Sequence, residues 1–247
     1  NTLNWQRSGL FTTYIDYQVI PRDAAFSITD ARGNRALAQL TERRSDGAYY
    51  AVWVDDIPAF GYRRYSIRVE GWQKNVAREL TDDEWVTMEN PWYRLVIDPE
   101  RAVITSLFDK SLGREWVDPN AGWKLGEFIY EQLDNREQME AFRLDNYTRE
   151  APEEVWLEAL EEGDVWTTLR FRGNTPAAIR NGGYSFEIRL FNTAKRIDLA
   201  YAIDKKLVTE PEGIYIAFPF ALENGQLAFD VPRGEVRAGI DQIPGSS

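Results

Sequence analysis

The sequence predicts an all-β fold, a small antiparallel β-sandwich followed by a larger β-sandwich. Segments of strand length in which apolar and polar residues alternate recur along most of the chain. Turn residues separate them at intervals of roughly 8–12 residues, a spacing typical of antiparallel sandwiches. The length of 247 residues is sufficient for two such units, and we expect them to span residues 1–86 and 87–247.

The first unit contains five expected strands, each followed by a turn or a bend. Gly33 lies in the turn over residues 31–34, where it supplies the positive φ that such a turn commonly requires. After the fifth strand the pattern loosens over residues 72–89. The acidic run 81–84 is compatible with a capping-box helix, but we interpret it as a solvated connector. The strands are expected over residues 11–20, 26–30, 38–40, 48–54 and 62–69.

The second unit opens with a predicted hairpin over residues 92–109, followed by a charged stretch in which residues 135–144 form a short helix. Residues 214–220 are apolar on both faces and are predicted to form a central strand covered on both sides. Pro219 indicates that pairing ends or bulges there. Further strands are expected over residues 155–159, 164–172, 185–191, 196–203, 228–231 and 235–237.

The composition excludes several classes of function. Forty acidic and 29 basic residues give a net charge of −11, which leaves no electrostatic basis for binding nucleic acid or an anionic membrane. The chain has no His and no Cys, so it offers no imidazole base, no thiolate and no zinc site of the usual kinds. We therefore expect no cofactor in this chain.

The apolar stretches are of strand length and fall far short of the ~20 residues that a membrane-spanning helix needs. The first residues lack the pattern of a signal peptide. We expect a soluble chain with no targeting segment, in a compartment that the sequence does not specify. Both ends lie within irregular sequence, and we interpret the chain as a fragment of a longer protein.

Three stretches in this order resemble the β-rich C-terminal part of the α-mannosidases of glycoside hydrolase family 38. The first spans residues 89–118 and includes the run Asn90-Pro91-Trp92-Tyr93. The second is 57–62 with Tyr65, and the third combines 212–220 with 241–245. The resemblance covers nearly the whole chain and implies a small Ig-like domain, followed by the front part of a galactose-mutarotase-like β-supersandwich that is incomplete at its C-terminus.

The resemblance implies that catalysis belongs to an N-terminal barrel outside this chain. In that family the barrel supplies a zinc ion and an Asp nucleophile for retaining hydrolysis of α-mannosides. The chain would then be a non-catalytic part that packs against barrel and helical domains and helps to shape the active site. The alternative is an independent carbohydrate-binding module without catalysis. An active mutarotase is disfavoured because the chain has no His.

No residue is predicted to be catalytic or to bind a metal. Because β-domain loops of the family approach the active-site mouth, we predict four substrate-proximal residues: Glu127, Tyr130, Asp241 and Gln242. Alternation over residues 126–131 places Glu127 and Glu131 on one face, with Phe128 and Tyr130 on the other. The simpler reading, which we favour for this segment, is an ordinary strand with Phe128 directed inward.

The nine Trp residues are candidate sugar platforms, because aromatic faces stack on the apolar faces of sugars. Trp53, Trp156 and Trp166 lie within alternating strands, where core packing is the usual role of a tryptophan. We expect these three side chains to be buried.

Overall fold

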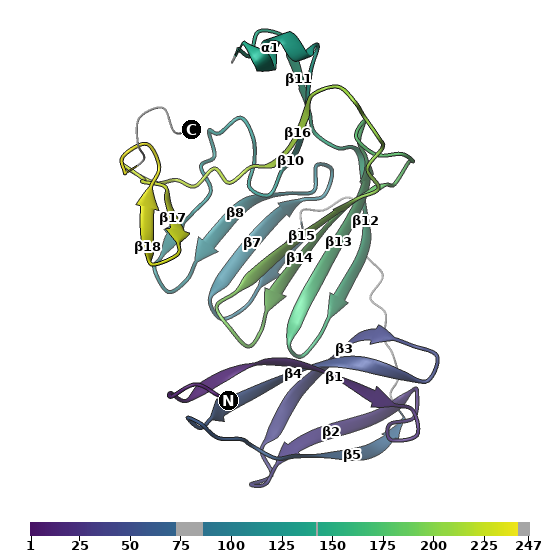
Figure 1. Ribbon diagram of the computed structural model, residues 1–247. Coiled ribbons are helices and arrows are strands. Elements are labelled where there is room, and N and C mark those ends of the chain that lie inside the picture. The colour runs from purple at the N-terminus through teal and green to yellow at the C-terminus, as the bar shows by residue number, and fades with distance from the viewer. Residues whose placement is uncertain (73–85, 142, 242–247) are drawn as a thin grey trace.

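The computed structural model describes residues 1–72, 86–141 and 143–241, in which almost all regular structure is antiparallel β-strand (Figure 1). The all-β prediction is confirmed. The acidic run 81–84 lies outside the described residues. Within the described ranges, no helix has the length and apolar character needed to cross a membrane.

The N-terminal unit is a five-stranded sheet folded over on itself, in the strand order β1-β4-β3-β2-β5. The sheet bends at β3. The first residues of β3 pair with β2, with Ala36 opposite Ile28, and from Leu37 onward β3 pairs with β4. The strands therefore form two layers around a core that includes Ile28, Tyr50 and Val52. The strands are β1 (Arg7–Asp16), β2 (Ala24–Asp30), β3 (Arg35–Arg43), β4 (Gly47–Ile57) and β5 (Tyr65–Trp72).

The C-terminal unit contains two four-stranded sheets that share one apolar core. Leu95 and Ile104 of the first sheet pack in the same cluster as Phe171, Phe186 and other residues of the second. The predicted hairpin over residues 92–109 is confirmed, with Leu95 opposite Leu107. The first sheet consists of β6 (Val86–Glu89), β7 (Tyr93–Asp98), β8 (Val103–Asp109) and β9 (Arg114–Glu115), and the second of β12 (Glu153–Glu162), β13 (Trp166–Asn174), β14 (Tyr184–Phe191) and β15 (Ile197–Ile203).

A three-stranded sheet in the order β11-β10-β16 closes one end of this sandwich. A short helix in the β10–β11 connection is confirmed, and the side chain of Asn135 caps it by accepting a hydrogen bond from the backbone N–H of Gln138. A separate two-stranded ribbon follows β16. The elements are β10 (Phe128–Leu133), α1 (Arg136–Glu140), β11 (Tyr147–Glu150), β16 (Glu212–Ile216), β17 (Ala228–Val231) and β18 (Gly234–Arg237).

The strands β3 and β4 of the N-terminal unit face the ends of β13 and β14 (Figure 1). Ala51 packs there with Val165, Trp166 and Phe191 in a small apolar cluster. The Oε1 atom of Gln39 accepts hydrogen bonds from the backbone N–H groups of Val165 and Trp166, at 3.2 and 2.9 Å. The contact between the units is therefore apolar at its centre and is oriented by one amide side chain.

Three predictions about local structure are wrong. Residues 86–89 form β6 instead of a connector, because they pair with β7. Residues 214–220 do not form a covered central strand: β16 is the outer strand of its sheet and ends at Ile216. Trp166 is buried as expected, but Trp156 is 44% exposed because it lies on the face of β12 opposite to Val155 and Leu157, which pack against the core. The predicted boundary between residues 86 and 87 stays a prediction, since residues 73–85 lie outside the described ranges.

We predict that the Gln39→Ala substitution weakens the contact between the units. The substitution leaves the N–H groups of two buried residues, Val165 and Trp166, without their acceptor, and an unsatisfied buried donor costs about 1–3 kcal/mol. The free energy of unfolding in urea, followed by tryptophan fluorescence, measures the effect. The control is Gln6→Ala, which removes an exposed hydrogen bond to Asp56. Equal effects of the two substitutions would contradict the assigned role of Gln39.

Candidate functional site

Two of the predicted residues lie in the interior of the C-terminal unit: Tyr130 in β10, and Glu127 directly before this strand. Phe128 and Tyr130 belong to the main core, and the Phe128 ring lies 5.0 Å from that of Tyr184. The inward direction of Phe128 is therefore confirmed. Glu127 and Glu131, on the other face of the strand, are also buried. Because both faces are covered, every charged group on β10 needs a partner within the protein.

Glu127 is held by groups from two turns. Its carboxylate is 1% exposed and lies 2.5 Å from the Nη2 atom of Arg101, in the β7–β8 turn. Its second oxygen accepts a hydrogen bond from the backbone N–H of Lys124 at 2.7 Å. The Arg101 side chain is about half exposed, so the pair has its positive end at the surface. A carboxylate bound in this way is fixed in direction.

Glu131 repeats this arrangement four residues further along the chain. Arg149 lies directly opposite it on β11, and the Nε atom of Arg149 is 2.5 Å from the carboxylate. This hydrogen bond raises the pKa of the Arg149 guanidinium above its usual range. The Tyr215 hydroxyl of β16 donates to the other carboxylate oxygen at 3.2 Å. One buried carboxylate therefore ties all three strands of this sheet together.

Tyr130 has its partners on the opposite face of β10. Its hydroxyl donates a hydrogen bond to Glu212, and the Nζ atom of Lys205 lies 2.6 Å from the same carboxylate. Burial raises the pKa of Tyr130 far above its usual value, and the bond to Glu212 raises it further. Burial also acts to raise the pKa of Glu212, but Lys205 and Tyr130 outweigh it, so that this pKa is lowered. The cluster is thus a neutral phenol beside an ion pair.

Asp241 does not join this group of residues. Asp241 follows β18 and is exposed. Within the described part of the chain, its carboxylate accepts hydrogen bonds from the backbone and side chain of Arg237, and the Nη2 atom of Arg237 lies 2.9 Å from the Oδ1 atom of Asp241. Hydrogen bonds from the side chain and backbone N–H of Arg237 lower the pKa of Asp241 to about 2. Gln242 lies outside the described residues. The structure therefore buries Glu127 and Tyr130 in the same unit, with separate partners on opposite faces, and leaves Asp241 at the surface.

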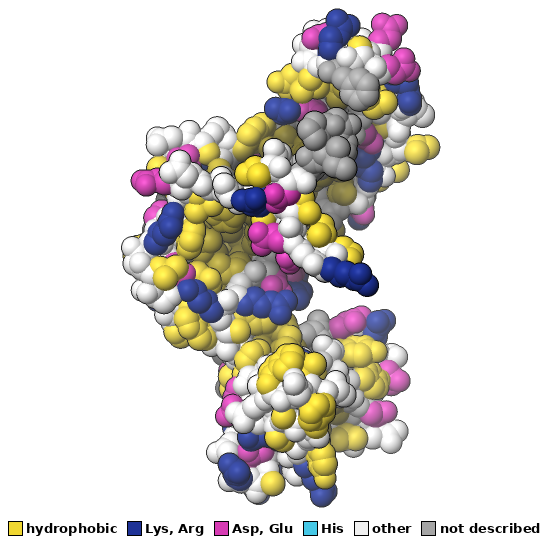
Figure 2. Space-filling view, turned by 60° about the vertical axis from the view of Figure 1, so that its left-hand side comes forward, with side chains coloured by type: hydrophobic (Ala, Val, Ile, Leu, Met, Phe, Trp, Pro, Cys, Tyr) yellow, Lys and Arg dark blue, Asp and Glu magenta, His cyan; other side chains and the backbone are white. Residues whose placement is uncertain are grey.

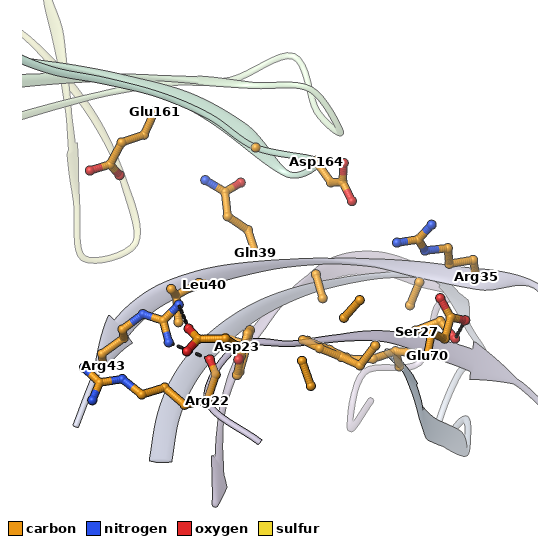
Figure 3. A pocket seen from close by; sticks show the side chains of 18 of the residues that line it. Arg22, Asp23, Ser27, Arg35, Gln39, Leu40, Arg43, Glu70, Glu161 and Asp164 are labelled. Atoms are coloured by element: carbon orange, nitrogen blue, oxygen red, sulfur yellow. Dashed lines mark hydrogen bonds and ion pairs between the residues drawn. The ribbon is translucent and has the colours of Figure 1, made fainter. Parts of the chain in front are cut away.

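A second polar site lies between the two units, in a cavity of about 520 Å³. Figure 3 shows Gln39 reaching from the N-terminal unit toward the β12–β13 turn, with Glu161 and Asp164 on the opposite wall. Ser27 donates a 2.5 Å hydrogen bond to Glu70 on one side of the cavity. Basic side chains, including Arg35, line the same space. The mixture of charges gives the cavity no clear preference for an anion or a cation.

The described residues contain no cluster of three or more His, Cys, Asp or Glu side chains that could hold a metal ion. The buried carboxylates of β10 do not fit this role, because arginine groups already occupy the positions next to Glu127 and Glu131. Chemically, the β10 site can hold fixed charges and orient neighbouring loops. It offers no pair of free carboxylates.

The partner residues of β10 were not identified from the sequence. Arg101 and Arg149 are separated from their carboxylates by 26 and 18 residues, and Glu212 is 82 residues from Tyr130. One signal was available: Glu127 and Glu131 share a strand face with the apolar Ile129 between them, a pattern that indicates buried charges. Nothing in the sequence around Arg149 or Glu212 pointed to the partners.

Comparisons with known proteins relate the sequence and the fold of this chain to one family of glycosyl hydrolases. Residues 88–243 match the family described as "Glycosyl hydrolases family 38 C-terminal domain". The solved structure of a glycosyl hydrolase family 38 protein from Enterococcus faecalis matches with a TM-score of 0.59 at 12% identity. The match covers 96% of this chain and 34% of that chain, so the present chain spans about a third of the length of that protein. At this identity the likeness concerns the fold. No curated protein matches the sequence.

We predict that Tyr130→Phe lowers the free energy of unfolding by about 1.5–3 kcal/mol at pH 7, the usual range for a hydrogen bond to a charged group. The pKa of Glu212 is lowered in the folded protein, so its stabilising contribution is present above the unfolded pKa and is lost as the pH falls through the folded one. The difference between the two proteins should therefore shrink below about pH 4.

Urea unfolding of both proteins between pH 3 and pH 7, the approximate range in which Glu carboxyl groups titrate, measures this dependence. The control is Tyr62→Phe, whose side chain is 85% exposed. A loss of stability that does not change with pH would show that Glu212 is not the partner that matters.

Proposed function

The chain belongs to the family of C-terminal domains of glycosyl hydrolases family 38, and from this premise we propose that it is the non-catalytic β-sandwich part of an α-mannosidase-like glycoside hydrolase. In this proposal it supports and shapes an active site that an N-terminal barrel supplies. The family match over residues 88–243 is the observation that carries the proposal.

The state of the buried carboxylates supports a non-catalytic role. A retaining glycosidase needs two carboxyl groups about 5 Å apart on either side of the scissile bond, one of them free to attack the sugar. Glu127, directly before β10, and Glu131, within it, are each bound to an arginine, and Glu212 is bound to Lys205 and Tyr130. These carboxylates form ion pairs and hydrogen bonds within the sandwich, so none of the three is free to attack a sugar.

The proposed parent enzyme hydrolyses α-mannosides with retention, using a zinc ion bound outside this chain. The length comparison is consistent with such a parent, because the matched family 38 protein is about three times as long as the region it shares with this chain. The predicted partners of the chain are therefore the remainder of the enzyme and, through it, a mannoside. The proposed contribution of this chain is positional: its ion pairs fix the loops that approach the active site.

An independent carbohydrate-binding module is the second candidate, and one cavity favours it. A space of about 360 Å³ is lined by apolar and aromatic side chains that include Tyr93, Trp116 and Phe220, and aromatic faces of this kind stack on sugars. The Arg114 guanidinium, however, already lies 4.4 Å from the Trp116 ring centre. We therefore place this candidate second.

We predict that the 247-residue chain alone hydrolyses no nitrophenyl α-mannoside, with or without added zinc, because the buried carboxylates in the described part of the chain are all paired. The polypeptide encoded by the complete reading frame that contains this chain should hydrolyse the same substrate. Turnover that purifies with the 247-residue chain, and disappears on substitution of one of its own carboxylates, would overturn the non-catalytic assignment. A complete polypeptide without a barrel would overturn the proposed parent.

We also predict that the 247-residue chain retains no stoichiometric zinc after dialysis, because zinc sites usually include His or Cys and this chain has neither. Elemental analysis of the dialysed protein is the measurement. One tightly held zinc ion per chain would contradict the prediction and would place part of the metal site in the sandwich.

A further inference from the structure

Residues 213–222 form an unusually apolar outer edge of the C-terminal unit, here called the apolar edge. The segment starts in β16 and carries no charged side chain over ten residues. On the face shown in Figure 2, hydrophobic side chains gather over the middle of the C-terminal unit. Five large apolar side chains of the edge are between 42% and 53% exposed: Ile214, Tyr215, Phe218, Phe220 and Leu222.

Only the inner side of the apolar edge is paired among the described residues. There β16 pairs with β10, and Ala217 exchanges backbone hydrogen bonds with Gly126 and Glu127, each 2.9 Å long. Pro219 then accepts from Asp118, and Ala221 donates to Trp116. The segment therefore runs along one side of the sandwich as its last, partly irregular strand. Its outer backbone groups have no strand beside them in the described part of the chain.

Other outer strands of the protein carry charges along their exposed length, whereas β16 carries only Glu212 at its first residue, and this carboxylate is bound to Lys205 and Tyr130. The strand β12 carries five glutamates, and β11 carries Arg149 and Glu150. Charged side chains on outer strands prevent the addition of further strands, and an exposed apolar outer strand without them is normally covered. The apolar edge lacks this protection. It has the features of a strand that is buried when its partner is present.

The cavity of about 360 Å³ described above adjoins the apolar edge. Phe220 and Leu222 of the edge line it together with Tyr93, Leu107, Trp116 and Ile197. All six lining side chains are apolar or aromatic. The surface therefore offers two features to the same partner: backbone groups along an open strand, and a hollow for a large apolar side chain.

The ribbon of β17 and β18 adds exposed apolar area after the edge. Phe229 and Val231 of this ribbon are 51% and 39% exposed. An isolated two-stranded ribbon is marginally stable in water, so this ribbon also needs a covering surface. Exposed apolar side chains therefore recur from β16 to β17, with the polar residues 223–226 between them.

We propose that an apolar β-strand from the remainder of the same hydrolase polypeptide covers the apolar edge and places a large side chain in the adjoining cavity. The inference rests on the proposed function. The matched family 38 protein has about two thirds of its length outside the shared region, which supplies the length of chain required. A second copy fits less well, because each copy carries a net charge of −11 and the two would repel.

The absence of cysteine from the chain allows a direct test by thiol labelling. The variants Ile214→Cys and Phe220→Cys place single thiols on the apolar edge. The matched control is Ile179→Cys, at an isoleucine that is 72% exposed and lies outside the edge. Each variant is made in the 247-residue chain and in the polypeptide encoded by the complete reading frame, after replacement by serine of any cysteine outside this chain.

We expect maleimide to label both edge thiols readily in the 247-residue chain, and about tenfold more slowly in the complete polypeptide, because a covered thiol reacts only when its cover opens. The control thiol should label at the same rate in both proteins. Equal labelling of the edge thiols in the two proteins would overturn the inference. So would labelling in the 247-residue chain that slows as its concentration rises, since a second copy would then be the occupant.

Mannosidase activity of the complete polypeptide, measured on the same samples, separates this inference from the proposed function. Hydrolysis without protection of the edge thiols overturns the inference and leaves the proposed function in place. Protection without hydrolysis overturns the proposed mannosidase and leaves the intramolecular cover of the apolar edge supported.

Discussion

The strand β10 can lie inside the C-terminal unit only because the charged side chains of Glu127, directly before it, and Glu131, within it, each meet an opposite charge. Moving an ion out of water costs several kcal/mol, and leaving a buried charge without its partner costs about 3–5 kcal/mol. Arg101 comes from the β7–β8 turn and Arg149 from β11, while Tyr130 bonds to Glu212 of β16. The β7–β8 turn, β11 and β16 are therefore all positioned by contacts with β10 and the residue before it.

This arrangement explains why the fold was more predictable than the site. Alternation in a single strand depends on the sequence of that strand, so hairpins such as residues 92–109 and the direction of Phe128 follow from local pattern. The partner of Glu127 depends on how two distant turns meet. The error at residues 214–220 has the same origin. An apolar run indicates that the segment needs to be covered, but it does not show whether a neighbouring strand lies on each side of it, and in the described residues β16 has a neighbour only on one side.

The distribution of charge on the outer strands links the fold to the proposed assembly. Glutamates on β12 face water in a protein with a net charge of −11, and they oppose the addition of strands on that side. The apolar edge at residues 213–222 carries no such charge. Between the two units, contact is instead made by a small apolar cluster and by Gln39. The charged strand β12 thus opposes the addition of another strand, the apolar cluster and Gln39 join the two units, and the apolar edge is suited to bind a partner.

The directions of the pKa shifts also bear on the proposed supporting role. A glycosidase general acid must hold its proton at working pH, which requires a carboxyl group with a raised pKa. Among the described residues, every carboxyl group whose pKa is clearly displaced has it lowered, as Asp109 does through its hydrogen bond with Lys195. Such groups stay ionised; most of them hold a Lys or Arg side chain in place, whereas Glu115 accepts hydrogen bonds from Ser106 and from backbone N–H groups. The phenol of Tyr130 is displaced upward and stays neutral. These side chains therefore keep fixed charge states, an arrangement that fits the supporting role proposed above.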